Sequence, residues 1–312
     1  MSNQVLLEIS LESSKTAARL LRRQWEAFTP VWGGERGSAG DGIVDLEALI
    51  LASMVFAHHD RRLWDVATWW AFNGSRFTSV HRMKSQVLGY SEDSAREALS
   101  DFAQSAKEGG DHRWEKFLAT ASERNRGSDA EFGNITLRCT ASLLPRLRSA
   151  FGVGVKPDVL TYLIGAQSDL NTASDIAKGL GYTPQAVRQA LQDMEVSGLV
   201  VFAGTRPAYV RVDRELWRGL LGLDEKPTWR FYGQVLAFLG DTNSWAIRNA
   251  AADRSIYILA SEAREMLERH ESAFVLNGLL PPATSHLTGT DFFGAINEGL
   301  ETIDRWIGES LS

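Results

Sequence analysis

Four polar side chains on one predicted helix have the chemistry of base recognition. Three carboxamides and one guanidinium are spaced at i, i+3, i+4 and i+7, so they share a single helical face. These residues are Gln185, Arg188, Gln189 and Gln192. Glutamine can pair with adenine through two hydrogen bonds, and arginine can do the same with guanine. The opposite face is apolar, with Val187, Ala190, Leu191 and Met194, as expected of a helix that is anchored on a core.

Local signals around this helix predict a tight turn and another helix before it. Thr183 is a side-chain cap, and Pro184 takes the first helical position, where a missing amide costs nothing. Thr172, with Asp175 three residues later, has the spacing of a capping box that begins the preceding helix. Gly198 ends the second helix at a position that favours left-handed backbone. The pattern is typical of a helix-turn-helix.

A β-hairpin is predicted directly after this helix pair. The runs 199–202 and 208–212 are rich in β-forming residues and flank the turn sequence Gly-Thr-Arg-Pro. Arg206 lies in this turn, from which a guanidinium can reach a phosphate or a narrow groove. In the second strand, Tyr209 and Arg211 alternate with apolar residues and so share the other face. Helix pair and hairpin together predict a winged helix-turn-helix.

Residues 143–213 resemble the winged-helix domains of bacterial transcription regulators of the ArsR and MarR kind. The resemblance rests on the stretch TASDIAKGLGYTPQAVRQALQDMEVSGLV at 172–200, whose Gly-Leu-Val end leads such proteins into the wing. It implies that the second helix approaches the major groove through Thr183, Gln185, Arg188, Gln189 and Gln192. It also implies that Arg206, with Tyr209 or Arg211, meets the DNA backbone or the minor groove. The flanking regions do not share this resemblance, which leaves the mode of dimerisation open.

The charge distribution agrees with a nucleic-acid partner for this module. The segment 138–212 holds eight basic and five acidic residues, so its net charge is +3. Because the whole chain has a net charge of −6, the rest of the chain carries −9. A basic module between acidic flanks is expected when only the module touches phosphate.

Apolar periodicity predicts helices on both sides of the module, so we expect a mainly α-helical chain with a two-stranded β wing. Three domains are predicted: a helical domain at 1–136, the winged helix-turn-helix at 137–213 and a second helical domain at 214–312. The polar, glycine-bearing segment 123–134 is interpreted as the first linker. The flanking helices are predicted at 11–28, 45–57, from Asp60 onward, 77–88, 91–107 with Ser91 as cap, 137–150 as a basic amphipathic helix, 214–221, 228–239, 243–252, 255–270 and 291–307.

Several classes of function lack their sequence signals. No apolar run approaches the roughly 20 residues of a membrane span, and no signal-peptide pattern is present, so we expect a cytoplasmic protein without a membrane partner. The lone cysteine, Cys139, predicts neither a disulfide nor a zinc site. We interpret His58-His59-Asp60 as polar residues at a helix end and not as metal ligands, because the side chains of adjacent helical residues point apart. We therefore predict no enzyme, no cofactor and no metal.

Three tryptophans on one predicted helix allow two interpretations. Trp64, Trp69 and Trp70 form an aromatic cluster of the kind that usually belongs to a core. The alternative is a pocket for an aromatic or lipophilic effector, bound by stacking and by an indole N–H.

The sequence thus predicts a DNA-binding transcription regulator. In this hypothesis the winged helix reads an operator in double-stranded DNA, while the flanking helices dimerise, sense a small molecule or recruit a protein. A single module buries little surface, so a homodimer is expected. The alternative is a non-catalytic interaction protein, such as an antitoxin-like subunit, whose winged helix docks onto another protein.

Overall fold

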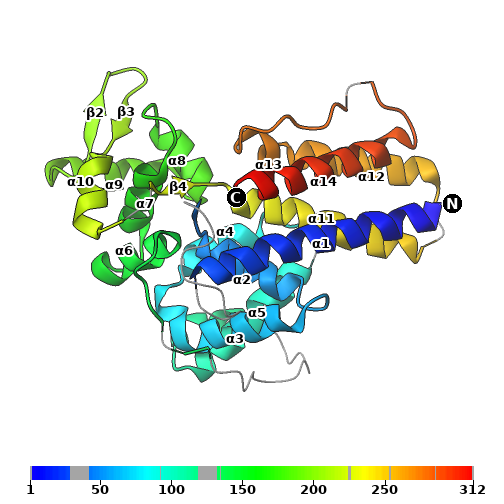
Figure 1. The fold of residues 1–312 in the computed structure, drawn as a ribbon, viewed down its shortest axis with the longest axis horizontal. Coiled ribbons are helices and arrows are strands. Elements are labelled where there is room, and N and C mark those ends of the chain that lie inside the picture. Colours follow the sequence, from blue (N-terminus) through cyan, green and yellow to red (C-terminus); the bar gives the residue numbers. More distant parts are fainter. Residues whose placement is uncertain are drawn as a thin grey trace.

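The computed structural model describes residues 2–28, 42–91, 93–118, 132–133, 135–223, 226–252, 254–284 and 286–310, and it is mainly α-helical (Figure 1). The predicted linker at 123–134 lies almost entirely outside these residues. The α-helices are α1 (Ser2–Phe28), α2 (Leu46–Val55), α3 (Arg61–Gly74), α4 (Val80–Val87), α5 (Ser94–Glu108), α6 (Leu143–Phe151), α7 (Val155–Gly165), α8 (Ala173–Leu180), α9 (Pro184–Val196), α10 (Arg214–Leu221), α11 (Tyr232–Ala250), α12 (Ile256–Arg269), α13 (Glu271–Val275) and α14 (Asp291–Ser310). Short 3-10 helices are η2 (Ser75–Phe77), η3 (His112–Phe117) and η4 (Thr140–Ser142), and the strands are β1 (Gly42–Ile43), β2 (Val201–Ala203), β3 (Tyr209–Arg211) and β4 (Thr228–Trp229).

Long helices from the two ends of the chain form one layer of the molecule. Helix α1 packs along α11 and also contacts α14, which in turn contacts α12. Figure 1 shows α1 in blue, α11 in yellow and α14 in red running together on the side of the molecule away from the β2–β3 hairpin. The first and last thirds of the chain therefore share one packed layer.

Helix α2 lies at the centre of the structure. All ten of its residues are buried, including Glu47 and Ser53, and it contacts α1, α3, α4, α5 and α11. The indole N–H of Trp25 on α1 donates to the Ser53 hydroxyl over 2.8 Å, which satisfies the polar atom of a fully buried ring. A helix without a solvent face needs neighbours on every side, and these five helices supply them.

The two small sheets differ in what they join. Strands β2 and β3 form an antiparallel hairpin in which Phe202 opposes Val210. Strands β1 and β4 pair in parallel, with Gly42 opposite Thr228 and Ile43 opposite Trp229. The hairpin is local, whereas the β1–β4 pair connects chain segments that are far apart in the sequence.

Near β4, the predicted helix boundaries are wrong. Thr228–Trp229 is a strand, and one helix, α11, continues through the break that was expected between 239 and 243. Gly240 lies inside this helix, and its lack of a Cβ lets the Tyr90 ring pack against the backbone, since a Cβ there would lie 2.5 Å from a ring carbon. The glycine is therefore a close packing contact and not a helix end.

Two further predicted boundaries are corrected by long-range contacts. Ser91 does not cap α5, which begins at Ser94; its backbone N–H and hydroxyl both bond to the Asp241 carboxylate, the hydroxyl at 2.7 Å. The predicted basic helix at 137–150 begins only at Leu143, after the 3-10 turn η4. Among the described residues, no helix has both the length and the apolar content needed to cross a bilayer.

Candidate nucleic-acid interface

Helix α8 and the turn after it form as the local sequence predicts. The Thr172 hydroxyl accepts from the Asp175 N–H, and the Asp175 carboxylate accepts from the Thr172 N–H, which completes a capping box. Gly181 ends the helix with φ +71°, a left-handed conformation that glycine adopts without a Cβ penalty. The chain can therefore turn sharply and enter α9.

Helix α9 presents an apolar face to its neighbours and a polar face to solvent. Thr183 accepts from the Ala186 N–H, and Pro184 fills the first turn. The buried residues are Val187, Ala190, Leu191 and Met194, and α9 packs on α7 and α8. The four residues singled out for base reading, Gln185, Arg188, Gln189 and Gln192, are all exposed, as is Thr183. The structure therefore places these five residues together at the surface, Thr183 at the start of α9 and the other four on its polar face.

Two contacts organise the charge on this polar face. The amide of Gln189 donates to Asp193 Oδ1 over 3.1 Å, and Lys156 Nζ lies 2.8 Å from Asp193 Oδ2. Hydrogen bonds from Lys156 and Gln189 lower the pKa of Asp193, so this carboxylate stays ionised and is compensated by the lysine. Arg188 makes no ion pair with any residue that the structure describes.

The β2–β3 hairpin stands beside α9 at one end of the molecule (Figure 1). The N–H of Val210 donates to the Asn171 carbonyl over 2.9 Å, which fastens the hairpin to the loop before α8. Val210 is buried, Tyr209 is half-buried, and both Arg206 and Arg211 are exposed. Within the described ranges, neither of these arginines has an ion-pair partner. The hairpin therefore carries two uncompensated cations next to the polar face of α9.

Five buried charged side chains lie beneath this region. We call Asp45, Glu47, Arg82, Arg148 and Asp158 the buried charge cluster. Arg148 reaches both Glu47 and Asp158, with its Nη1 2.5 Å from Glu47 Oε1 and its Nε 2.7 Å from Asp158 Oδ1. Arg82 Nη2 lies 2.5 Å from Asp45 Oδ2, while burial raises the pKa of Asp45 against the opposing effect of Arg82. The cluster joins α2, α4, α6 and α7.

The turn between α8 and α9 is held onto this cluster by Tyr182. Its hydroxyl donates to Asp158 Oδ2 over 2.8 Å, and its ring stacks on His81 of α4 with centroids 4.8 Å apart and an interplanar angle of 2°. The His81 Nε2 also lies 3.2 Å from the Gly181 carbonyl oxygen. Burial and the Asp158 charge raise the pKa of Tyr182, so its hydroxyl remains a donor at neutral pH. These contacts fix the position of α9, and so of its exposed face, relative to the rest of the protein.

The predicted basic helix does not contribute its central arginine to the surface. Arg148 is 1% exposed and is enclosed by carboxylates, although the helical pattern favoured a solvent-exposed basic face. Its partner Asp158 is also buried, so the two charges cancel. The net charge of segment 138–212 is therefore unchanged by their burial. The basic residues of segment 138–212 that are exposed are Arg138, Lys156, Lys178, Arg188, Arg206 and Arg211.

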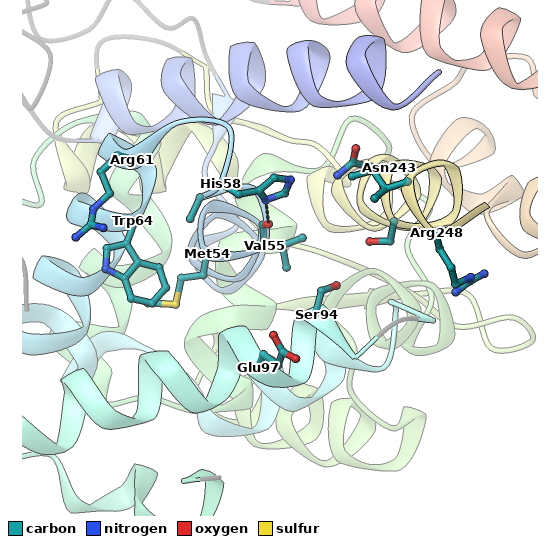
Figure 2. Close-up of a pocket in the computed structure, with 12 residues that line it drawn as sticks. Met54, Val55, His58, Arg61, Trp64, Ser94, Glu97, Asn243 and Arg248 are labelled. Carbon is teal, nitrogen blue, oxygen red and sulfur yellow. Dashed lines mark hydrogen bonds between the residues drawn. The ribbon is translucent and has the colours of Figure 1, made fainter. Parts of the chain in front are cut away.

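The three tryptophans do not share one pocket. Trp70 is fully buried, donates to the Thr78 hydroxyl over 3.2 Å and packs edge-on against Phe28, so it belongs to the core. Trp69 is half-buried against Phe132, with ring centroids 5.6 Å apart. Trp64 lines a cavity together with residues of α2, the α2–α3 turn, α5 and α11 (Figure 2).

The histidine pair is also placed by the structure. The His58 and His59 rings lie 4.0 Å apart at their centroids, and His59 Nε2 lies 2.6 Å from the Ser14 hydroxyl. Burial, and then the neighbouring His58, lower the pKa of His59. No group of three or more histidine, cysteine or carboxylate side chains suited to a metal ion occurs among the residues described.

Comparison with protein-family models, curated proteins and solved structures finds no match to the chain. The buried charge cluster was not anticipated from the sequence, although acidic residues within the apolar run at 45–55 were a usable signal, because an ionised side chain there needs a partner.

Proposed function

We propose that this protein binds double-stranded DNA as a winged helix-turn-helix regulator, with α9 in the major groove and the β2–β3 hairpin as the wing. The observation that carries the proposal is the exposed glutamine and arginine face of α9 beside two hairpin arginines that lack ion-pair partners among the described residues. Side chains of these types recognise adenine, guanine and phosphate.

The proposed role of each residue follows from its side-chain chemistry and its position. Arg206 and Arg211 would neutralise phosphates and so supply affinity for any duplex. Gln185, Arg188 and Gln192 would contact base edges, with Thr183 at the start of the helix. Gln189 would exchange its bond to Asp193 for a base, and Lys156 would keep Asp193 compensated while this happens. Tyr209 would support the wing at its half-buried base.

The proposal is tested by measuring binding to labelled duplexes by fluorescence anisotropy between about 50 and 200 mM salt. The full-length chain is first used to select a preferred site from a random duplex library. Arg206→Ala should weaken binding to all duplexes and reduce the slope of log K against log salt by about 1. Arg188→Ala should cost about 1–3 kcal/mol on the selected site and little on random DNA.

Arg62→Ala is the matched control, because Arg62 is an exposed arginine on α3 without an ion pair to a described residue. It should leave both the affinity and the salt slope unchanged. If Arg188→Ala and Arg206→Ala behave like the Arg62 control, or if no duplex binds at low salt, the DNA-binding proposal is wrong.

A second function, docking onto protein, is favoured by α10. None of its eight residues is buried, and Leu216 and Leu220 are 56% and 66% exposed although the helix has a strongly apolar side. Apolar side chains gathered on one exposed helix face are typical of a protein contact. We propose that this face belongs to a homodimer contact, which a single DNA-reading module also requires for specific affinity. A non-catalytic, antitoxin-like subunit is the alternative use of the same surface.

A further inference from the structure

A cavity of about 300 Å³ lies where the loop before α8 meets the segment between β4 and α11, and the residues at the end of α13 also line it. It shares no lining residue with the cavity of Figure 2. Its volume is at the small end of the range of about 300–1,000 Å³ that is usual for small-molecule sites. A cavity of about 150 Å³ holds one benzene ring, so this one has room for a molecule of two fused rings.

Three aromatic side chains line this cavity. The centroid of the Tyr162 ring lies 5.8 Å from that of Trp229 and 6.3 Å from that of Phe231, with interplanar angles of 55° and 60°. Tyr162 and Trp229 are both buried, so surrounding side chains hold their rings in place. Rings set at such angles offer faces and edges against which another flat ring can pack. The shape and chemistry of the lining therefore favour a planar aromatic molecule.

Trp229 carries a buried hydrogen-bond donor that lacks an acceptor. Its indole Nε1 is enclosed and has no hydrogen-bond partner among the residues that the structure describes. By contrast, the buried indoles of Trp25, Trp70 and Trp245 each donate to a side-chain oxygen. An indole N–H can only donate, and a buried donor is rarely left unpaired. A carbonyl oxygen of a bound molecule would satisfy it.

Asn171 provides an acceptor on the same lining. Its Nδ2 donates to the Ser168 carbonyl over 2.5 Å, and because a carbonyl oxygen can only accept, this bond fixes which end of the amide is the oxygen. The Oδ1 of Asn171 accepts from no described residue. The amide of Asn277 is already used, since its Oδ1 accepts from the Phe231 N–H and its Nδ2 donates to the Ala273 carbonyl.

The lining does not select for a charged molecule. Among the described residues around the cavity, only Arg230 is charged at neutral pH, and its guanidinium lies over the Trp306 ring, 5.8 Å from the centroid. Burial, and then the charge of Asp175, raise the pKa of Tyr162 to about 12, so its hydroxyl stays neutral. An uncharged ligand with one donor and one acceptor matches these groups best.

We propose that this cavity binds a small, uncharged aromatic lactam. The lactam carbonyl would accept from Trp229 Nε1, the lactam N–H would donate to Asn171 Oδ1, and the rings would pack on Tyr162 and Phe231. The backbone carbonyl of Asn171 also accepts from the Val210 N–H, so the bound molecule would touch the loop that holds the β2–β3 hairpin. The inference does not depend on DNA binding, because its test involves no nucleic acid.

The test is isothermal titration of the full-length protein, near neutral pH, with 2-quinolinone and 1-isoquinolinone. At least one of these lactams should bind with a dissociation constant below about 1 mM, as expected for a ligand of this size. The N-methyl derivative of the lactam that binds keeps the rings and the carbonyl but loses the donor, so it should bind at least about five-fold more weakly. Failure of both lactams to bind, or equal binding of the N-methyl derivative, overturns the proposal.

Two variants locate the site. Trp229→Phe keeps an aromatic ring but removes the indole N–H, and it should weaken binding by about two- to ten-fold. Val275→Trp should narrow the cavity from an exposed position and weaken binding by at least about ten-fold, and it decides the location alone if Trp229→Phe does not fold. Val201→Trp is the matched control, because both valines are 55% exposed and Val201 does not line the cavity. Wild-type affinity in Val275→Trp or in folded Trp229→Phe, or an equal loss in Val201→Trp, overturns the assignment.

Discussion

Replacing Arg148 by methionine should destabilise the protein more than any single surface change. Arg148 is fully enclosed, and its guanidinium makes five hydrogen bonds, two to Glu47, two to Asp158 and one to the Phe77 carbonyl. Methionine fills most of the volume but leaves two buried carboxylates without their principal cation. Breaking a buried ion pair in this way costs about 3–5 kcal/mol.

The expected value lies toward the lower end of that range, because both carboxylates keep another partner. Glu47 Oε1 still accepts from the Ser79 N–H at 2.7 Å, and Asp158 still accepts from the Tyr182 hydroxyl. Arg82 remains within 3.5 Å of Glu47. A loss of about 3 kcal/mol is a large part of the 5–15 kcal/mol typical of a folded protein, so the variant should fold but unfold at lower denaturant.

The measurement is urea unfolding followed by both far-UV circular dichroism and tryptophan fluorescence, because coincident curves are needed before a single free energy is derived. Arg146→Met is the control on the same helix: Arg146 is half-buried and has no ion pair to a described residue. If Arg148→Met lowers the free energy of unfolding by less than about 1 kcal/mol, or by no more than Arg146→Met, the account of the buried charge cluster is refuted.

In urea unfolding, Gly181→Ala should lower the free energy of unfolding several times more than Gly198→Ala does. Both glycines have φ near +70°, but only at Gly181 would a Cβ clash, 2.3 Å from the Ser85 hydroxyl. Equal losses in the two variants would contradict this. Leu220→Lys should shift the protein from dimer to monomer in analytical ultracentrifugation, and an unchanged mass would exclude α10 from the contact. His59→Gln should flatten the acid side of the stability profile. The lowered pKa of His59 means that the unfolded chain binds the proton more tightly, so wild-type stability falls as pH drops below about 6.5, and an equally steep fall in the variant would reject this role.

The parts of the fold that could be predicted from the sequence depend on residues close together in the chain. The capping box at Thr172, the turn at Gly181, the Thr183 cap and the Asp60 cap of α3 are all confirmed. Each needs only backbone groups within three or four residues, so the local pattern contains the whole interaction. The exposure of the α9 polar face follows from the same local periodicity.

The errors arise where a distant residue decides the outcome. Ser91 has a side chain suited to a helix cap, yet its backbone N–H and its hydroxyl both donate to Asp241, which lies on another helix. Arg148 looks like a surface cation until Glu47 is placed beside it. Neither of these pairings leaves a spacing signal in one sequence.

The small parallel sheet has a consequence for the order in which the chain folds. Pairing Gly42 with Thr228 closes a loop that contains every element from α2 to α10, at an entropic cost of about 5 kcal/mol. Strands of two residues each cannot recover that cost alone. The pair must therefore form after helix packing has brought its strands together, with α7 approaching so closely that a Cβ on Gly165 would lie 2.5 Å from Ile43 and 2.8 Å from the Trp229 nitrogen. Hydrogen-exchange protection at this sheet should be among the last acquired during refolding, which makes it a marker of the fully assembled chain.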